Sequence, residues 1–145
     1  MFLQGLTKEE CKMLNPVTLA FVGDAVYALY VRERLVKTSG GKVADFQRAS
    51  AKILSAHGQS EFLNEILPLF TEEESEIFRR GRNAKKATKS KNASPVEYNR
   101  STGLEAVIGF LYLTENTERI KELLSAISEE KFQIVAQVGA FKPSH

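Results

Sequence analysis

The sequence has almost no cysteine, so internal disulfide cross-links are excluded. Cys11 is its only cysteine, and tryptophan is absent. One thiol can neither form an internal disulfide nor supply a Cys-rich zinc cluster. We therefore expect Cys11 to be a packing residue and the fold to depend on a hydrophobic core.

Long hydrophobic runs are also missing. No segment approaches the roughly twenty apolar residues that a helix needs to cross a bilayer. The first residues, MFLQGLTKEE, do not combine a basic stretch with a long apolar region, so they do not resemble a secretory signal. We expect a cytoplasmic protein without a membrane partner.

Length and composition indicate one ordinary globular domain. The chain has 145 residues, of which 43% are hydrophobic and 26% are charged. A chain of this size can bury most of its apolar surface without disulfides or a structural metal. We predict one domain over residues 1–145, with its core at about 15–124.

Positive charge is concentrated in one part of the chain. Residues 79–100 contain eight Lys and Arg and a single acid, Glu97, although the whole chain has a net charge of only +2. Clustered cations gain affinity for nucleic acids by releasing the counterions condensed on phosphates. The segment therefore indicates a nucleic-acid partner, and the alternative is a solvated charge run without a ligand.

Helical signals cover most of the chain, and no convincing strand is present, so we predict an all-α fold. Thr7 and Glu10 fit a capping box, and Thr71 and Glu74 can cap another short helix. Pro16 suits the first turn of a long helix, and Gly40 and Gly41 end that helix. Further helices are expected over 43–67 (one bent helix or two), after Thr71, over 96–113, and as a last pair between 116 and 143, with a basic loop at 79–95.

Two acids stand alone in apolar helices. Asp24 is the only charged residue between Pro16 and Val31, and Glu105 is the only one between Ser101 and Leu113. A carboxylate in apolar surroundings is disfavoured unless it meets a cation, hydrogen-bond donors or a metal. We expect both acids to be buried. Gly23 and Gly109 would let the two helices approach closely.

A divalent cation would explain the pair. Two carboxylates brought together without a cation repel each other, and one is driven to bind a proton. Mg²⁺ prefers oxygen ligands and often binds through one or two carboxylates together with substrate phosphate. The alternative is that hydroxyls such as those of Tyr27, Thr102 or Tyr112 satisfy the acids individually.

Three motifs carry a family resemblance. FVGDAV at 21–26 and LEAVIGFLYL at 104–113 resemble the signature and the second acidic motif of the ribonuclease III family. RGRNAK at 80–85 resembles a loop of its Mini-III branch, which has the catalytic domain without the double-stranded-RNA-binding domain. The resemblance spans about Asn15 to Leu124. It implies a ribonuclease III-like all-α endonuclease domain that forms a homodimer.

The resemblance also implies an activity. Asp24 and Glu105 would hold Mg²⁺, with Mn²⁺ able to substitute, and water would attack a phosphodiester bond of double-stranded RNA. The products carry a 5′-phosphate and a 3′-hydroxyl, and each subunit of the homodimer cuts one strand. The family further suggests maturation of the 23S ribosomal RNA precursor, with a ribosomal protein as an assisting partner.

The sequence also departs from the family. Further acids of the family lie four residues before the signature aspartate and three before the second-motif glutamate, where this chain has Ala20 and Thr102. The Mini-III branch shares this reduced set, which leaves open whether one or two metal ions bind. An ungapped match places another acid of the family at Glu61, our third catalytic candidate.

The basic segment is the predicted RNA contact. Double-stranded RNA is recognised mainly through its shape, its phosphates and its 2′-hydroxyls, which Lys, Arg and Asn side chains can reach. No aromatic residues interleave the cations, which argues against a platform for single strands. The predicted RNA-binding residues are Arg79, Arg80, Arg82, Asn83, Lys85, Lys86, Lys89 and Lys91.

Alternative interpretations stay open at this point. The chain could be a non-catalytic module that binds double-stranded RNA, or a helical adaptor whose basic loop binds an acidic protein. His57 could approach the substrate, although a lone histidine is more often structural or simply exposed. Ser101 and Thr102 could donate to metal-bound waters, or they could cap or pack.

Overall fold

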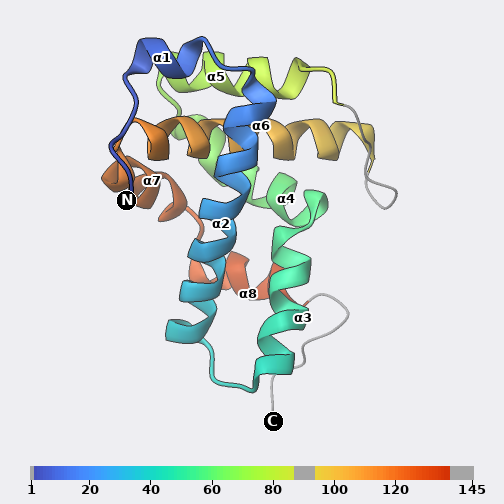
Figure 1. The fold of residues 1–145 in the computed structure, drawn as a ribbon. Coiled ribbons are helices and arrows are strands. Elements are labelled where there is room, and N and C mark those ends of the chain that lie inside the picture. The colour runs from blue at the N-terminus through green and yellow to red at the C-terminus, as the bar shows by residue number, and fades with distance from the viewer. Residues whose placement is uncertain (1, 87–93, 138–145) are drawn as a thin grey trace.

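The computed structural model describes residues 2–86 and 94–137, and within them it contains helices and no strand. This confirms the all-α prediction. Figure 1 shows the arrangement, in which α6 runs horizontally below α5 and crosses α2 in the upper part of the view. The helices are α1 (Lys8–Lys12), α2 (Pro16–Thr38), α3 (Val43–Leu54), α4 (Ala56–Ile66), the 3₁₀ helix η1 (Leu67–Leu69), α5 (Glu72–Asn83), α6 (Pro95–Leu113), α7 (Thr117–Leu124) and α8 (Glu129–Gln137).

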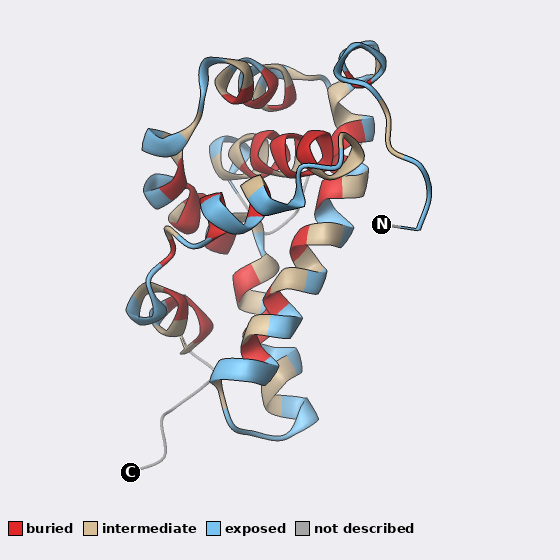
Figure 2. Cartoon of the chain, turned by 90° about the vertical axis from the view of Figure 1, so that its left-hand side faces the viewer, coloured by how far each residue is buried: buried red, intermediate tan, exposed pale blue. Residues whose placement is uncertain are grey.

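Helix α6 forms the centre of the core. It starts at Pro95, with the Ser94 side chain accepting a hydrogen bond from Glu97 N, and apart from Glu105 it is apolar or aromatic from Leu104 onward. A helix that is hydrophobic all round is stable only when other elements surround it. Helices α2, α4, α5 and α7 all pack against it. Accordingly, nearly every residue of its second half is buried, as Figure 2 shows.

Helices α2 and α6 touch through two glycines, as the sequence predicts. A Cβ atom on Gly23 would lie 1.7 Å from the carbonyl oxygen of Glu105, and one on Gly109 would lie 1.9 Å from that of Leu19. Only hydrogen fits in the space that these backbones leave. The crossing therefore places Asp24, the neighbour of Gly23, directly against the turn of α6 that carries Glu105.

The 43–67 segment forms two helices, and the break lies at Ser55. This residue ends α3, and its side chain accepts a hydrogen bond from Gly58 N to start α4. A Cβ on Gly58 would lie 2.3 Å from the carbonyl oxygen of Lys52. Gly58 is thus needed for the sharp turn between the helices, but it is not the break itself.

Helix α5 covers another side of α6 and continues further than the sequence predicts. Its N-terminus has the expected capping box between Thr71 and Glu74, and its last residue is Asn83. Residues 79–83 of the predicted basic loop are therefore helical, because the apolar side of the last turns still packs on α6. Buried Glu74 also accepts two hydrogen bonds of 2.8 Å from Arg119 of α7.

Cys11 is fully buried in the core, which confirms that it is a packing residue. Across the part of the chain that the structure describes, no helix combines the length and the apolarity needed to span a membrane.

Candidate active site

Asp24 and Glu105 line the same cavity. Asp24 comes from the middle of α2 and Glu105 from the middle of α6, and the glycine crossing brings their turns together. The cavity has a volume of about 230 Å³ and is open to solvent. Its lining residues are Val17, Ala20, Phe21, Asp24, Lys86, Tyr98, Thr102 and Glu105.

Glu105 holds a proton under conditions in which a free glutamate does not. Burial raises the pKa of Glu105 most, its hydrogen bond with Asp24 raises it further, and a hydrogen bond from Gln59 opposes them, so that the value reaches about 8. At neutral pH the neutral carboxyl of Glu105 therefore donates to Asp24. Two carboxylates that share one proton in this way are typical of like charges held together.

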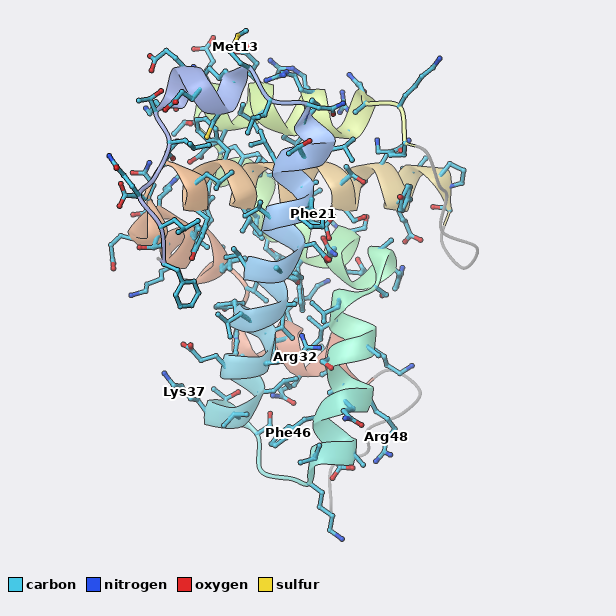
Figure 3. All side chains as sticks on the ribbon, in the orientation of Figure 1. Met13, Phe21, Arg32, Lys37, Phe46 and Arg48 are labelled. Carbon is cyan, nitrogen blue, oxygen red and sulfur yellow. The ribbon has the colours of Figure 1, made fainter. Side chains whose placement is uncertain are left out.

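Asp24 is not buried, and the prediction that both acids are buried is wrong for this residue. Asp24 is exposed, and so are the large apolar residues Phe21 and Leu29 on the same helix. Figure 3 labels Phe21 and Arg32, two side chains of α2. The apolar neighbours of Asp24 in the sequence therefore do not all surround it, because part of α2 lies uncovered by this chain.

Gln59 is a site residue that the sequence reasoning missed. Its side chain is 2% exposed, and its Nε2 donates to Glu105 Oε2 and to the carbonyl oxygen of Leu54, each at 3.1 Å. Its Oε1 is buried without a hydrogen-bond partner in the structure. A polar amide at a buried position of α4, with no local partner in the sequence, was the signal that could have identified it.

Hydroxyl groups do not take the place of Gln59. Tyr27 is fully buried, and its hydroxyl has no hydrogen-bond partner among the residues that the structure describes. Ser101 and Thr102 both donate to the carbonyl oxygen of Tyr98, at 2.8 and 3.1 Å, so they act as local helix contacts in this structure. Glu105 therefore receives its hydrogen bond from the amide of Gln59, and not from the hydroxyls of Tyr27, Ser101 or Thr102.

A family model described as the ribonuclease III domain matches residues 17–116, which include the crossing of α2 and α6 and both acids. The chain belongs to the ribonuclease III family. Within that family, its resemblance to the Mini-III branch is confirmed by its relatives.

The relatives match over most of their length. The Mini-ribonuclease 3 of Staphylococcus aureus is 45% identical over 118 residues, which cover 80% of this chain and 88% of that protein. The Mini-ribonuclease 3 of Symbiobacterium thermophilum is 43% identical over 116 residues, covering 80% and 89%. A crystal structure of a Fusobacterium nucleatum protein superposes with a TM-score of 0.70 at 28% identity, covering 79% of this chain and 92% of that one.

The cavity between α2 and α6 contains two acids. Ala20 and Thr102, the positions where the family resemblance expects further acids, both line it. Among the residues that the structure describes, no group of three or more His, Cys, Asp or Glu side chains could hold a metal ion. The cavity is therefore built around a carboxylate pair and an amide.

The structure does not bring Glu61 to this pair. Glu61 lies on α4 and is 3.8 Å from Lys131 of α8, and it lines a separate cavity together with His57. His57 is exposed, and its Nδ1 lies 2.6 Å from Glu97 Oε2. The residue of α4 that contacts Glu105 is Gln59, two residues before Glu61. A catalytic role of Glu61 stays a prediction.

The predicted RNA-binding residues have different environments. Arg79, Asn83 and Lys85 are exposed. Arg80 donates to the carbonyl oxygen of Leu14 at 3.3 Å, and the guanidinium of Arg82 lies 5.7 Å from the ring centre of Phe78. Lys86 donates to three backbone carbonyls. The last two predicted residues, Lys89 and Lys91, lie outside the described residues.

Proposed function

We propose that this protein is an endoribonuclease that hydrolyses double-stranded RNA at the cavity between α2 and α6, with Mg²⁺ bound by Asp24 and Glu105. Family membership supports the reaction class, because proteins of the ribonuclease III family act on double-stranded RNA and depend on divalent metal ions. The observation that carries the proposal is that Asp24 and Glu105, from two different helices, line one solvent-open cavity.

The residues present fit a divalent cation. Two adjacent carboxyl groups put oxygen ligands in place, and a cation would relieve the repulsion between their negative charges. Gln59 donates to Oε2 of Glu105, which orients that carboxyl group within the cavity. When bound there, Mg²⁺ would neutralise negative charge on the scissile phosphate and lower the pKa of a water molecule.

The reaction is an in-line displacement at phosphorus. Water oxygen forms a bond to phosphorus, the bond from phosphorus to the 3′ oxygen breaks, and a proton is transferred to that oxygen. The products are the 5′-phosphate and the 3′-hydroxyl that the family resemblance implies. The chain's own residues bind and orient the substrate. Asp24 and Glu105 would hold the metal ion at the cavity, and cations at the end of α5 would contact neighbouring phosphates.

A homodimer is part of this proposal. Phe21, Leu29 and Val36 on α2 are 79%, 66% and 65% exposed, and their spacing places them on one side of the helix. A row of large apolar side chains on one surface helix is typical of a protein interface. A second copy that covers this side would place two cavities on one assembly, one for each strand of a duplex.

The proposed physiological substrate is the precursor of 23S ribosomal RNA. The support is the family resemblance together with the Mini-ribonuclease 3 relatives, and a ribosomal protein as assisting partner belongs to the same proposal. The competing function is a module that binds double-stranded RNA without cutting it. The acid pair favours the enzyme, because a binder has no need for two adjacent carboxylates beside a basic surface.

Substitution of the acids tests the activity. We expect Asp24→Asn and Glu105→Gln to reduce Mg²⁺-dependent cleavage of duplex RNA by at least about a hundredfold, since each removes a metal ligand. Glu118→Gln, at an exposed position of α7, is the control and should cleave normally. The measurement is the rate at which a labelled duplex is shortened, with Mg²⁺ or with a chelator. A wild-type protein that retards the duplex on a gel but never shortens it would establish the non-catalytic alternative.

A further inference from the structure

Lys86 follows the end of α5, and its ammonium group is fully engaged by the backbone. Nζ donates to the carbonyl oxygens of Ala84, Gly81 and Arg82 at 2.8, 2.9 and 3.0 Å. An ammonium group has three N–H donors, so these three hydrogen bonds use all of them. The last carbonyls of an α-helix have no partner inside the helix, and a cation there also meets the negative end of the helix dipole.

The same side chain forms part of the cavity wall. Lys86 lines the cavity together with Asp24 and Glu105, and it is only partly exposed. Its burial lowers the pKa of Lys86. The preceding residue, Lys85, is exposed. Two lysines that are adjacent in the sequence therefore have different surroundings, one in solvent and one bound to the helix end.

We propose that Lys86 is a positioning residue and not a phosphate ligand. By binding the last carbonyls of α5 at the wall of the cavity, it holds the point at which the basic segment leaves the helix. It thereby sets the distance between the cations that contact RNA and the acid pair that supports cleavage. Lys85, with its donors directed to solvent, is the phosphate ligand of the two. This inference rests on the proposed function.

Substitution by methionine separates the two roles, because it keeps most of the side-chain stem and removes the charge. For Lys86→Met we expect a cleavage rate at saturating enzyme at least about tenfold lower, with the salt dependence of duplex binding in chelator unchanged. For Lys85→Met we expect weaker binding, with the slope of log K against log salt reduced by about one. Lys121→Met on α7 is the neutral control. Lys86→Arg, which restores cation and donors, should recover most of the rate.

Lysine labelling of the wild-type protein gives a second measurement that needs no variant. Lys85 should react quickly with an amine-directed reagent and be protected by duplex RNA, whereas Lys86 should react slowly with or without RNA. Rapid labelling of Lys86 that RNA suppresses, or a Lys86→Met protein that loses salt dependence but keeps its rate, would overturn the inference. A wild-type protein that leaves duplex RNA intact would instead contradict the proposed function. The labelling rates would still show whether Lys85 and Lys86 differ in accessibility.

Discussion

At the scale of single residues, the site depends on a proton that Glu105 retains at neutral pH. Its carboxyl group is held against Asp24 by the helix crossing, and Gln59 donates to it from the other side. A metal ion that binds both carboxylates must displace this proton. Metal affinity should therefore rise with pH until Glu105 is ionised.

The raised pKa of Glu105 also predicts how the stability of the metal-free protein changes with pH. Glu105 of the folded state keeps its proton up to its pKa of about 8, whereas an unfolded glutamate loses it near the ordinary pKa of 4.5. Between these values the folded state binds more protons, so its stability falls as pH rises, by at most about 1.4 kcal/mol per pH unit. We expect Glu105→Gln to flatten this fall.

The measurement is urea unfolding in chelator at several pH values between 5 and 8. The difference between wild type and Glu105→Gln isolates this residue, because other titrating groups such as Glu74 are common to both proteins. The pKa of Glu74 is lowered by Arg119 and Thr71 despite its burial, so its stabilising effect is lost only at lower pH. Parallel curves for the two proteins would show that Glu105 does not hold the proton.

At the scale of helices, the α2–α6 crossing determines whether the acids meet. No side chain larger than hydrogen fits at Gly23 or Gly109, because each position touches the backbone of the other helix. Backbone atoms cannot move aside as a flexible side chain can. The separation of the two helices, and with it the distance between the acids, therefore depends on these glycines.

We predict that Gly109→Ala is strongly destabilising. A Cβ there would lie 1.9 Å from the carbonyl oxygen of Leu19, so the helices must separate, at a cost of about 1–3 kcal/mol or more. Gly40→Ala is the matched control, since a Cβ at Gly40 meets nothing within 4 Å. Thermal or urea unfolding measures both. Equal stability of the two variants would mean that the helices do not cross as closely as described.

At the scale of the whole molecule, the uncovered side of α2 is the main feature that one chain leaves unexplained. The long helix buries Leu19, Tyr27, Val31 and Leu35 against its own domain, yet it exposes an apolar row on the opposite side. Asp24 lies at the surface of this same helix. A second copy on this side would bury the apolar row and enclose the neighbourhood of the acid pair.

Leu29→Lys should therefore weaken the homodimer while the fold stays intact. A charge introduced into an apolar interface must be desolvated without a partner, which costs several kcal/mol. Ile134→Lys, at an exposed apolar residue of α8, is the control and should not change the mass. Light scattering after size-exclusion chromatography measures the mass, and circular dichroism checks the fold. A wild-type protein that is monomeric at high concentration would contradict the proposed dimer.

Much of the architecture follows from local sequence. The Thr7 and Thr71 capping boxes form as predicted, and α2 and α6 begin at their prolines. Such signals act within one or two helical turns, so neighbouring residues suffice to read them. The predicted loop at 79–95 was too long at its N-terminal end, because residues 79–83 stay helical where α5 packs on α6. Packing of this kind cannot be read from local periodicity.

The candidate site also combines features that local sequence predicts with features that depend on packing. The two acids, the nearby glycines and the family can be recognised from the sequence, because lone carboxylates in apolar helices and the motifs around them are visible residue by residue. Tertiary packing sets the exposure of Asp24, the contact of Gln59 with Glu105 and the binding of Lys86 to the end of α5. These facts depend on which helices cover one another and on contacts between residues far apart in the chain, and no local pattern encodes such contacts.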